Sequence, residues 1–81
     1  MNLTRNQDHS LRQAPPLNKA VHAWEELRMG EMVEVWAGGS YAYMAYIDDR
    51  SNDGQLLWII EDGTATRTLF LRDDNITLYP V

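Results

Sequence analysis

Acidic side chains are the most numerous groups in this sequence that could take part in chemistry, and most come as adjacent pairs. The pairs are Glu25-Glu26, Asp48-Asp49, Glu61-Asp62 and Asp73-Asp74. Neighbouring residues of a strand point to opposite faces of a sheet, so the two members of a pair do not converge on one substrate. The spacing of Asp48, Asp49 and Asp53 also lacks the pattern of a calcium loop.

Nucleophilic and metal-binding residues are equally sparse. The chain has no cysteine, and its two histidines, His9 and His22, are far apart in the sequence. No serine lies in a nucleophile elbow, and no glycine-rich phosphate loop is present. We therefore predict that the protein is not an enzyme and that it holds no metal ion and no cofactor.

Most aromatic side chains lie between residues 36 and 79. They are Trp36, Tyr41, Tyr43, Tyr46, Trp58, Phe70 and Tyr79. If Val33 faces the core, strand alternation turns Trp36 to solvent. An inward Leu69 would turn Phe70 to solvent in the same way. Because Tyr and Trp are common anchors of protein interfaces, outward rings predict a binding surface.

The predicted partner-binding surface combines five of these rings with two acidic residues that could help to hold a cation by cation–π attraction. It consists of Trp36, Tyr41, Tyr43, Tyr46, Phe70, Asp48 and Asp49. The alternative is that the rings pack beneath the N-terminal segment, together with Trp24. The sequence leaves both interpretations open.

Charge is distributed unevenly along the chain. The formal net charge is +2 up to His22 and −7 from Ala23 onward, which gives −5 in total. Nucleic-acid affinity comes mainly from Lys and Arg, so an acidic C-terminal region is not expected to bind nucleic acid. A partner protein with a basic surface is favoured. Alternatively, the negative charge serves only solubility.

The N-terminal region differs from the rest in composition. Residues 1–17 are mostly polar, lack periodicity and end near Pro15-Pro16, which predicts an extended or flexible arm. No stretch is long and apolar enough for a membrane span or a signal peptide. We expect no membrane association and a cytoplasmic location, or a particle assembled inside the cell.

Residues 18–29 have the pattern of a short helix. Asn18 is a suitable N-cap, Val21, Trp24 and Leu27 or Arg28 recur at helical spacing, and Gly30 is a suitable stop. Alternatively, Leu27 and Met29 are already extended and lead into the first strand. An isolated helix of this length is marginal in water. The segment is therefore expected to pack against the remainder of the chain.

Residues 30–81 show the alternation and turn residues of a small β domain. Strands are expected at residues 31–36, 41–47, 55–61, 66–71 and 76–79. They are separated by turns at residues 38–40, 52–54 and 62–63 and by a tight helical turn at residues 72–75. Five short strands gain most by closing into an antiparallel barrel, which removes exposed edges. Its expected core is Val33, Val35, Ile47, Leu56, Trp58 or Ile59, Leu69, Leu71, Ile76 and Leu78.

One expected strand also has the composition of an aggregation-prone segment. Residues 41–47 are uncharged and favour β structure, and Asp48-Asp49 follows them as a charged stop. If this strand lay at a sheet edge, it could pair with a strand of a partner.

The order of strands and turns resembles the SH3-like small barrels, including Tudor-type and KOW-type modules. The residues that carry the resemblance are Gly30-x-x-Val33-x-Val35, the glycine loop 38–40, Gly54 before Leu56–Ile60, Asp62-Gly63, Leu69-x-Leu71, and Asp73-x-Asn75 before Ile76-x-Leu78. The proline-binding SH3 motif and its long acidic loop are missing, and KOW modules are usually basic. The resemblance therefore implies the fold, and it favours a Tudor-like aromatic site over a proline-peptide groove.

The sequence thus predicts a mainly β protein, with an arm (1–17), a short helix (18–29) and a five-stranded antiparallel SH3-like barrel (30–81). The leading functional hypothesis is a non-catalytic protein–protein interaction module. One alternative is a structural subunit of a larger assembly, such as a phage head or tail accessory protein, that self-associates through residues 1–17. Another is an acidic inhibitor of a basic site on a host protein.

Overall fold

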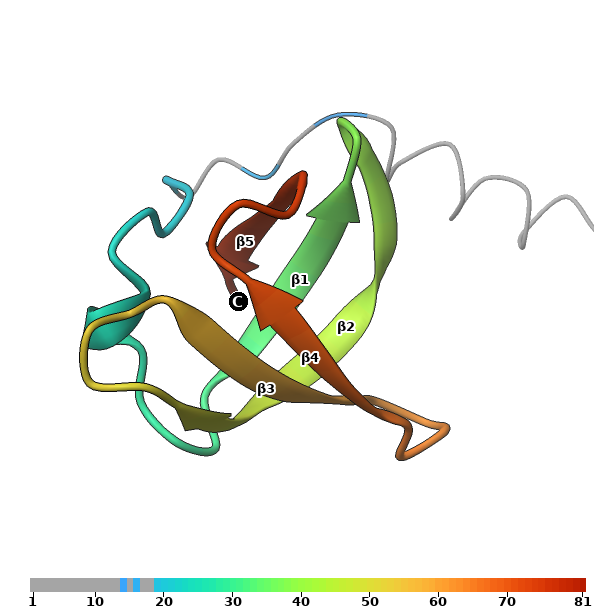
Figure 1. Ribbon diagram of the computed structural model, residues 1–81. Coiled ribbons are helices and arrows are strands. Elements are labelled where there is room, and N and C mark those ends of the chain that lie inside the picture. The colour runs from blue at the N-terminus through green and yellow to red at the C-terminus, as the bar shows by residue number, and fades with distance from the viewer. Residues whose placement is uncertain (1–13, 15, 17–18) are drawn as a thin grey trace, which may run out of the picture.

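The computed structural model describes Ala14, Pro16 and residues 19–81. One short 3₁₀ helix and five strands form the described part of the chain (Figure 1). They are η1 (Trp24–Glu26), β1 (Met32–Ala37), β2 (Ser40–Arg50), β3 (Leu56–Glu61), β4 (Arg67–Leu71) and β5 (Ile76–Pro80). The expectation of a mainly β protein with five antiparallel strands is confirmed. The arm predicted at residues 1–17 lies outside the described residues except for Ala14 and Pro16.

The strands form one antiparallel sheet in the order β4-β3-β2-β1-β5. β2 is the longest strand and lies at the centre of the sheet. Its residues from Tyr41 to Tyr46 lie along β1 and those from Ala45 to Ile47 pair with β3, so only the C-terminal part of the uncharged stretch 41–47 has a strand on both sides. Glycines with positive φ allow the tight connections: Gly38 and Gly39 turn β1 into β2, and Gly63 lies between β3 and β4. The glycine positions in the sequence therefore determine where the strands reverse.

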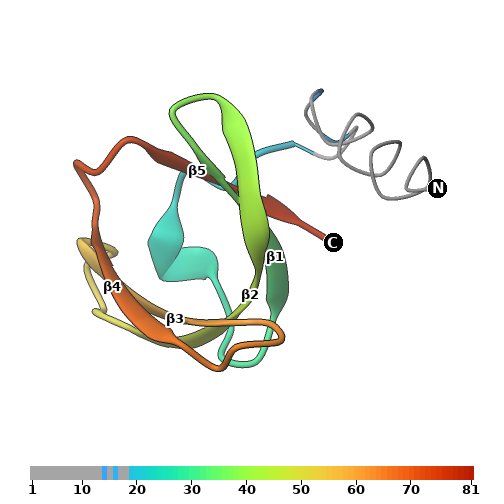
Figure 2. The same cartoon turned by 90° about the vertical axis from the view of Figure 1, so that its right-hand side faces the viewer.

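The sheet curls but does not close, so the prediction of a closed barrel is wrong. β4 and β5 are its two edges and do not pair with each other. The segment that precedes β1 lies inside the curve of the sheet (Figure 2). Its Trp24 and Leu27 belong to the same buried cluster as Val33 and Leu78. Because this segment covers the concave face, the core is complete without a fifth strand pairing, between β4 and β5.

The helix predicted at residues 18–29 is also wrong. Asn18, its expected N-cap, lies outside the described residues. Val21 is extended and bridges Leu78, its amide donating to the Leu78 carbonyl at 2.8 Å. Only a single 3₁₀ turn follows, flanked by extended Ala23 and Leu27. A short helix has little stability of its own, so pairing with β5 and burial of the apolar side chains decide the conformation.

The buried core lies between the concave face of the sheet and the N-terminal segment. Its members are Trp24, Leu27, Val33, Val35, Ala45, Ile47, Leu57, Ile59 and Leu78. Ile76 packs against this cluster as expected. Leu57 pairs with Phe70, so both side chains lie on the concave side, and Phe70 packs against the cluster.

The side chains of β4 and of the start of β3 therefore face the opposite way from the prediction. Leu56, Leu69 and Leu71, expected in the core, lie on the outer face and are exposed, and Trp58 pairs with Leu69 there. The run 56–60 is apolar throughout, so its sequence has no alternation that would reveal which side faces inward.

Gly54 fixes the N-terminal segment against the turn between β2 and β3. It is buried with φ of +73°, and a Cβ at this position would collide with the Glu25 side chain and come within 3.0 Å of the Glu25 amide nitrogen.

We expect Gly54→Ala to lower the free energy of unfolding by about 2–3 kcal/mol, because left-handed strain and overpacking add. Gly63→Ala is the matched control: its φ is also positive, at +92°, but nothing lies within 4 Å of its added Cβ. Urea denaturation measures both variants. Equal losses in the two would show that the contact with Glu25 contributes nothing.

Candidate functional site

The outer face of β3 and β4 carries an exposed apolar surface. We call Leu56, Trp58, Leu69 and Leu71 the β3–β4 patch. Leu56 pairs with Leu71, and Trp58 pairs with Leu69, so the four side chains form two adjacent rows on one face. Leu56 is 41% exposed, Leu69 is 38% exposed and Leu71 is 48% exposed, whereas Trp58 is partly buried. Tyr46 of β2, 37% exposed, lies on the same outer face farther along the sheet.

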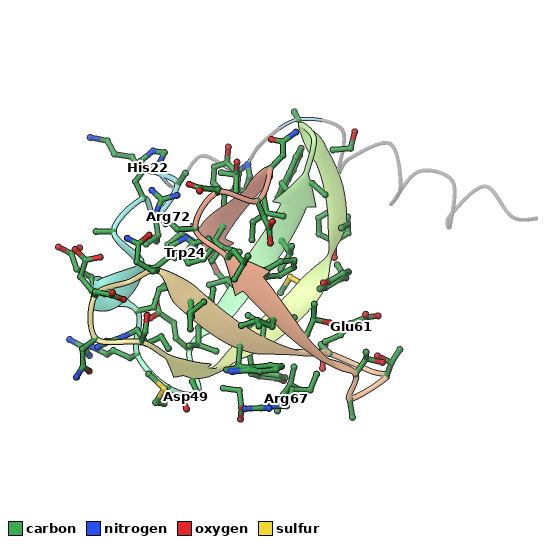
Figure 3. The ribbon with its side chains drawn as sticks, in the orientation of Figure 1. His22, Trp24, Asp49, Glu61, Arg67 and Arg72 are labelled. Carbon is green, nitrogen blue, oxygen red and sulfur yellow. The ribbon has the colours of Figure 1, made fainter. Side chains whose placement is uncertain are left out.

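A charged pair borders the β3–β4 patch and covers part of Trp58. The Arg67 guanidinium lies 3.9 Å from the centre of the Trp58 ring, and its Nε donates to Asp48 Oδ2 at 2.7 Å. Arg67 and Asp49 point away from the core on this outer side in Figure 3. Exposed ion pairs add little stability, so the main effect of this contact is to orient Arg67 over one face of Trp58.

The patch adjoins an unpaired strand edge. In β4, alternate residues direct their backbone groups toward β3, as the hydrogen bonds Glu61 N–H to Thr66 O (2.8 Å) and Arg72 N–H to Gln55 O (2.9 Å) establish. The backbone groups of Arg67, Leu69 and Leu71 therefore point away from β3. Within the described part of the chain, no strand pairs with this side of β4.

The C-terminal end of this edge is capped by a turn. The Leu71 amide donates to Asp74 Oδ2 at 2.8 Å, and the Leu71 carbonyl accepts from the Asp74 amide at 2.9 Å. Such caps limit the length of an edge that another chain could use. The open part of the edge is thus reduced to Arg67 and Leu69.

The rings of the predicted binding surface lie in three separate places. Trp36 is 2% exposed, so its predicted exposure is wrong. It packs edge-to-face with Tyr41 at 6.1 Å and with Tyr79 at 5.8 Å between ring centres, and its Nε1 donates to Glu34 Oε1 at 3.0 Å. This aromatic group joins β1, β2 and β5, toward the edge of the sheet that is opposite β4.

The other rings of that surface divide between the two faces. Phe70 and Tyr43 pack against the core cluster from the concave side, so the predicted exposure of Phe70 is also wrong. Tyr46 is exposed as expected, and its hydroxyl lies 3.5 Å from Asp62 Oδ1.

The two acidic members of the predicted surface lie in β2 beside β3. Asp48 pairs with Arg67, and Asp49 is exposed and lies opposite Trp58. Tyr46, Asp48 and Asp49 are thus the predicted site residues that lie near the β3–β4 patch. Whether any of the predicted residues binds a partner stays a prediction.

Burial changes the acidity of Tyr43. Desolvation, together with the negative charge of Glu61, raises the pKa of its phenol above 10.0. The folded state therefore favours the protonated phenol, and this contribution to stability is complete below pH 10 and lost as the pH rises through the folded-state pKa.

We expect the free energy of unfolding to fall more steeply above pH 10 in the wild type than in Tyr43→Phe, which cannot ionise. Denaturant titrations from pH 8 to pH 11 measure the difference between the two curves. Tyr41→Phe is the matched control. Parallel curves for wild type and Tyr43→Phe would contradict the expectation.

The residues of the candidate site that the sequence did not reveal are Leu56, Leu69 and Leu71. Their outward orientation follows only from the register of β3 with β4. Because Leu57 faces the core, its partner Phe70 must also face the core, and the leucines on either side of each residue turn outward. In residues 19–81, no three His, Asp or Glu side chains are grouped closely enough to hold a metal ion. No described helix is long and apolar enough to cross a membrane.

Comparison of the chain with protein-family models, curated proteins and solved structures found no match.

Proposed function

We propose that this protein is a non-catalytic module that binds another protein through the β3–β4 patch. The observation that carries the proposal is the exposure of three leucines beside Trp58 on one face of a domain that has few residues to bury. Apolar side chains gathered on the surface of a small domain mark interaction sites, and a partly buried Trp is a frequent anchor.

The charge around the patch supports a partner with a basic surface. Asp49 lies in β2 opposite Trp58, Asp62 follows β3, and Asp73 and Asp74 follow β4. Arg67, the one cation of β4, is already paired with Asp48. Complementary charge accelerates encounter and excludes acidic competitors.

We also propose that the domain is an SH3-like small barrel in the broad sense, with an open seam between β4 and β5. Five short antiparallel strands, the tight turns and the pairing of β1 with both β2 and β5 support this assignment. The burial of Trp36 and the inward position of Phe70 argue against a Tudor-like aromatic cage built from those two rings.

The double variant Leu69→Thr/Leu71→Thr tests the proposed site. Threonine keeps the strand propensity of β4 and removes apolar surface. We expect capture of the partner, identified by affinity purification from the native host and mass spectrometry, to fall by at least about tenfold, which corresponds to about 1.4 kcal/mol. The melting temperature should change by only a few degrees, because exposed substitutions are nearly neutral.

Met29→Thr is the matched control, because Met29 is 50% exposed but lies in the turn before β1, outside the patch. It should leave capture unchanged. If the double variant retains full capture, the β3–β4 patch is not the binding surface.

A further inference from the structure

The open edge of β4 is suited to backbone recognition as well as to side-chain contact. The N–H and C=O groups of Arg67 and Leu69 point away from β3, whereas those of Leu71 are used by Asp74. At the other edge of the sheet, Val21 already bridges Leu78 of β5. Arg67 and Leu69 of β4 therefore form a sheet edge that is open for strand addition.

Both faces beside this edge offer contacts to an added strand. A strand paired with β4 would place alternate side chains on the two faces of the sheet. On the outer face they would meet Leu69 and the aliphatic part of Arg67. On the concave face they would meet Thr68 and Phe70, which are both only partly buried. An alternation of apolar side chains would therefore add surface burial to the backbone hydrogen bonds.

The two ends of β4 carry the same sign of charge. Glu61 and Asp62 lie at the end where β4 begins, and Asp73 and Asp74 follow the end where it stops. The two arginines of this region are engaged: Arg67 with Asp48, and Arg72 with the His22 carbonyl at 2.6 Å. A strand with Lys or Arg at its ends would face carboxylates at both ends of the edge.

The same charges disfavour a second copy of this chain as the occupant. Antiparallel pairing of two β4 strands would bring Asp73 and Asp74 of one copy beside Glu61 and Asp62 of the other. Like charges in such positions are repulsive. The net charge of −5 on each chain adds to this effect.

We infer that the β4 edge binds an extended segment of a different protein as an added antiparallel strand, apolar at alternate positions and basic at its ends. This inference rests on the proposed function, because it names the kind of partner that the β3–β4 patch receives.

The probe is a short synthetic peptide of alternating valine and threonine with two lysines at each end, added to the full-length protein. Amide hydrogen exchange followed by NMR reports pairing residue by residue. We expect the exchange of the Arg67 and Leu69 amides to slow by about tenfold or more at saturation. The Thr68 amide, which already faces β3, is the internal control and should change little.

Two modified peptides separate backbone pairing from side-chain docking. Methylation of the backbone nitrogens along one edge leaves the other edge free to pair, so binding should persist. Methylation along both edges removes every donor and should abolish binding. Glutamate in place of the terminal lysines should weaken binding by about tenfold at low salt, and by less as salt screens the charges.

The protein side of the pairing is tested by Leu69→Pro against Leu69→Thr. Proline is tolerated on an edge strand where its nitrogen faces solvent, and it removes the donor that the peptide needs. Leu69→Pro should therefore bind the peptide at least about tenfold more weakly than Leu69→Thr.

Equal binding of the peptide methylated on both edges, or no binding of any peptide, would overturn strand addition. Slowed exchange of the Arg67 and Leu69 amides that depends on protein concentration without peptide would assign the edge to a second copy instead, and would also overturn strand addition.

If strand addition fails while Leu69→Thr/Leu71→Thr still loses capture of the natural partner, the proposed function stands. If capture is unaffected, the proposed function fails regardless of the peptide result.

Discussion

Replacing Trp24 by alanine should lower the free energy of unfolding by about 4 kcal/mol, the typical cost of removing a large buried aromatic side chain. Trp24 is 2% exposed and belongs to the core cluster, although it lies in a segment with almost no regular structure. The Arg72 guanidinium, 5.2 Å from the ring centre, extends over it from the end of β4. Because small domains have only several kcal/mol in total, a large fraction of Trp24→Ala should be unfolded at 37 °C.

Urea denaturation followed by circular dichroism measures this loss. His22→Ala is the control, because His22 is exposed and its carbonyl, which binds Arg72, is retained. The control should change stability by no more than about 0.5 kcal/mol. If Trp24→Ala is as stable as His22→Ala, the N-terminal segment does not complete the core, and the open sheet would need another cover.

The second large effect is expected at Trp36. If this residue formed an exposed binding surface, alanine would weaken partner binding and leave the melting temperature nearly unchanged. Its actual burial predicts the opposite: Trp36→Ala should lower the free energy of unfolding by about 3 kcal/mol, through lost packing with Tyr41 and Tyr79.

Trp36→Phe is the milder variant. It keeps an aromatic ring between Tyr41 and Tyr79 but removes the indole N–H that donates to Glu34 and part of the buried ring volume. We expect it to cost about 1–2 kcal/mol, less than Trp36→Ala, because one hydrogen bond and some packing are lost. A melting temperature for Trp36→Ala equal to that of the wild type would show that the aromatic group at β1, β2 and β5 is not structural.

The three tryptophans therefore have different expected roles. Trp24 and Trp36 are each 2% exposed, on the concave and the outer side of the sheet respectively, and both are expected to stabilise the fold. Trp58 remains partly exposed within the β3–β4 patch, beneath Arg67. Of the three, Trp58 is the one whose replacement should affect binding more than stability.

Local features of the sequence were enough to predict the strands. The five strands lie close to the expected ranges, because β-favouring runs alternate with turns whose glycines adopt positive φ. The inward position of Val33 and Val35 also followed from simple alternation in β1. These features depend on neighbours a few residues apart, and such neighbours are visible in the sequence.

Contacts between distant segments decided the rest. Residues 18–29 were expected to be helical, but Val21 pairs with Leu78, and Trp24 and Leu27 join the core, so burial determined their conformation. That burial also made closure of the sheet unnecessary. In the candidate site, Tyr46, Asp48 and Asp49 could be named in advance, whereas Leu56, Leu69 and Leu71 could not.

The sequence by itself determined the β class, the number of strands, the turn positions and the acidic character of residues 23–81. The facing of β3 and β4, the burial of Trp36 and the open edge of β4 were decided only by the tertiary structure. The physical reason is that an apolar run has no preferred side of its own: strand register and the cover supplied by Trp24 select which side is buried.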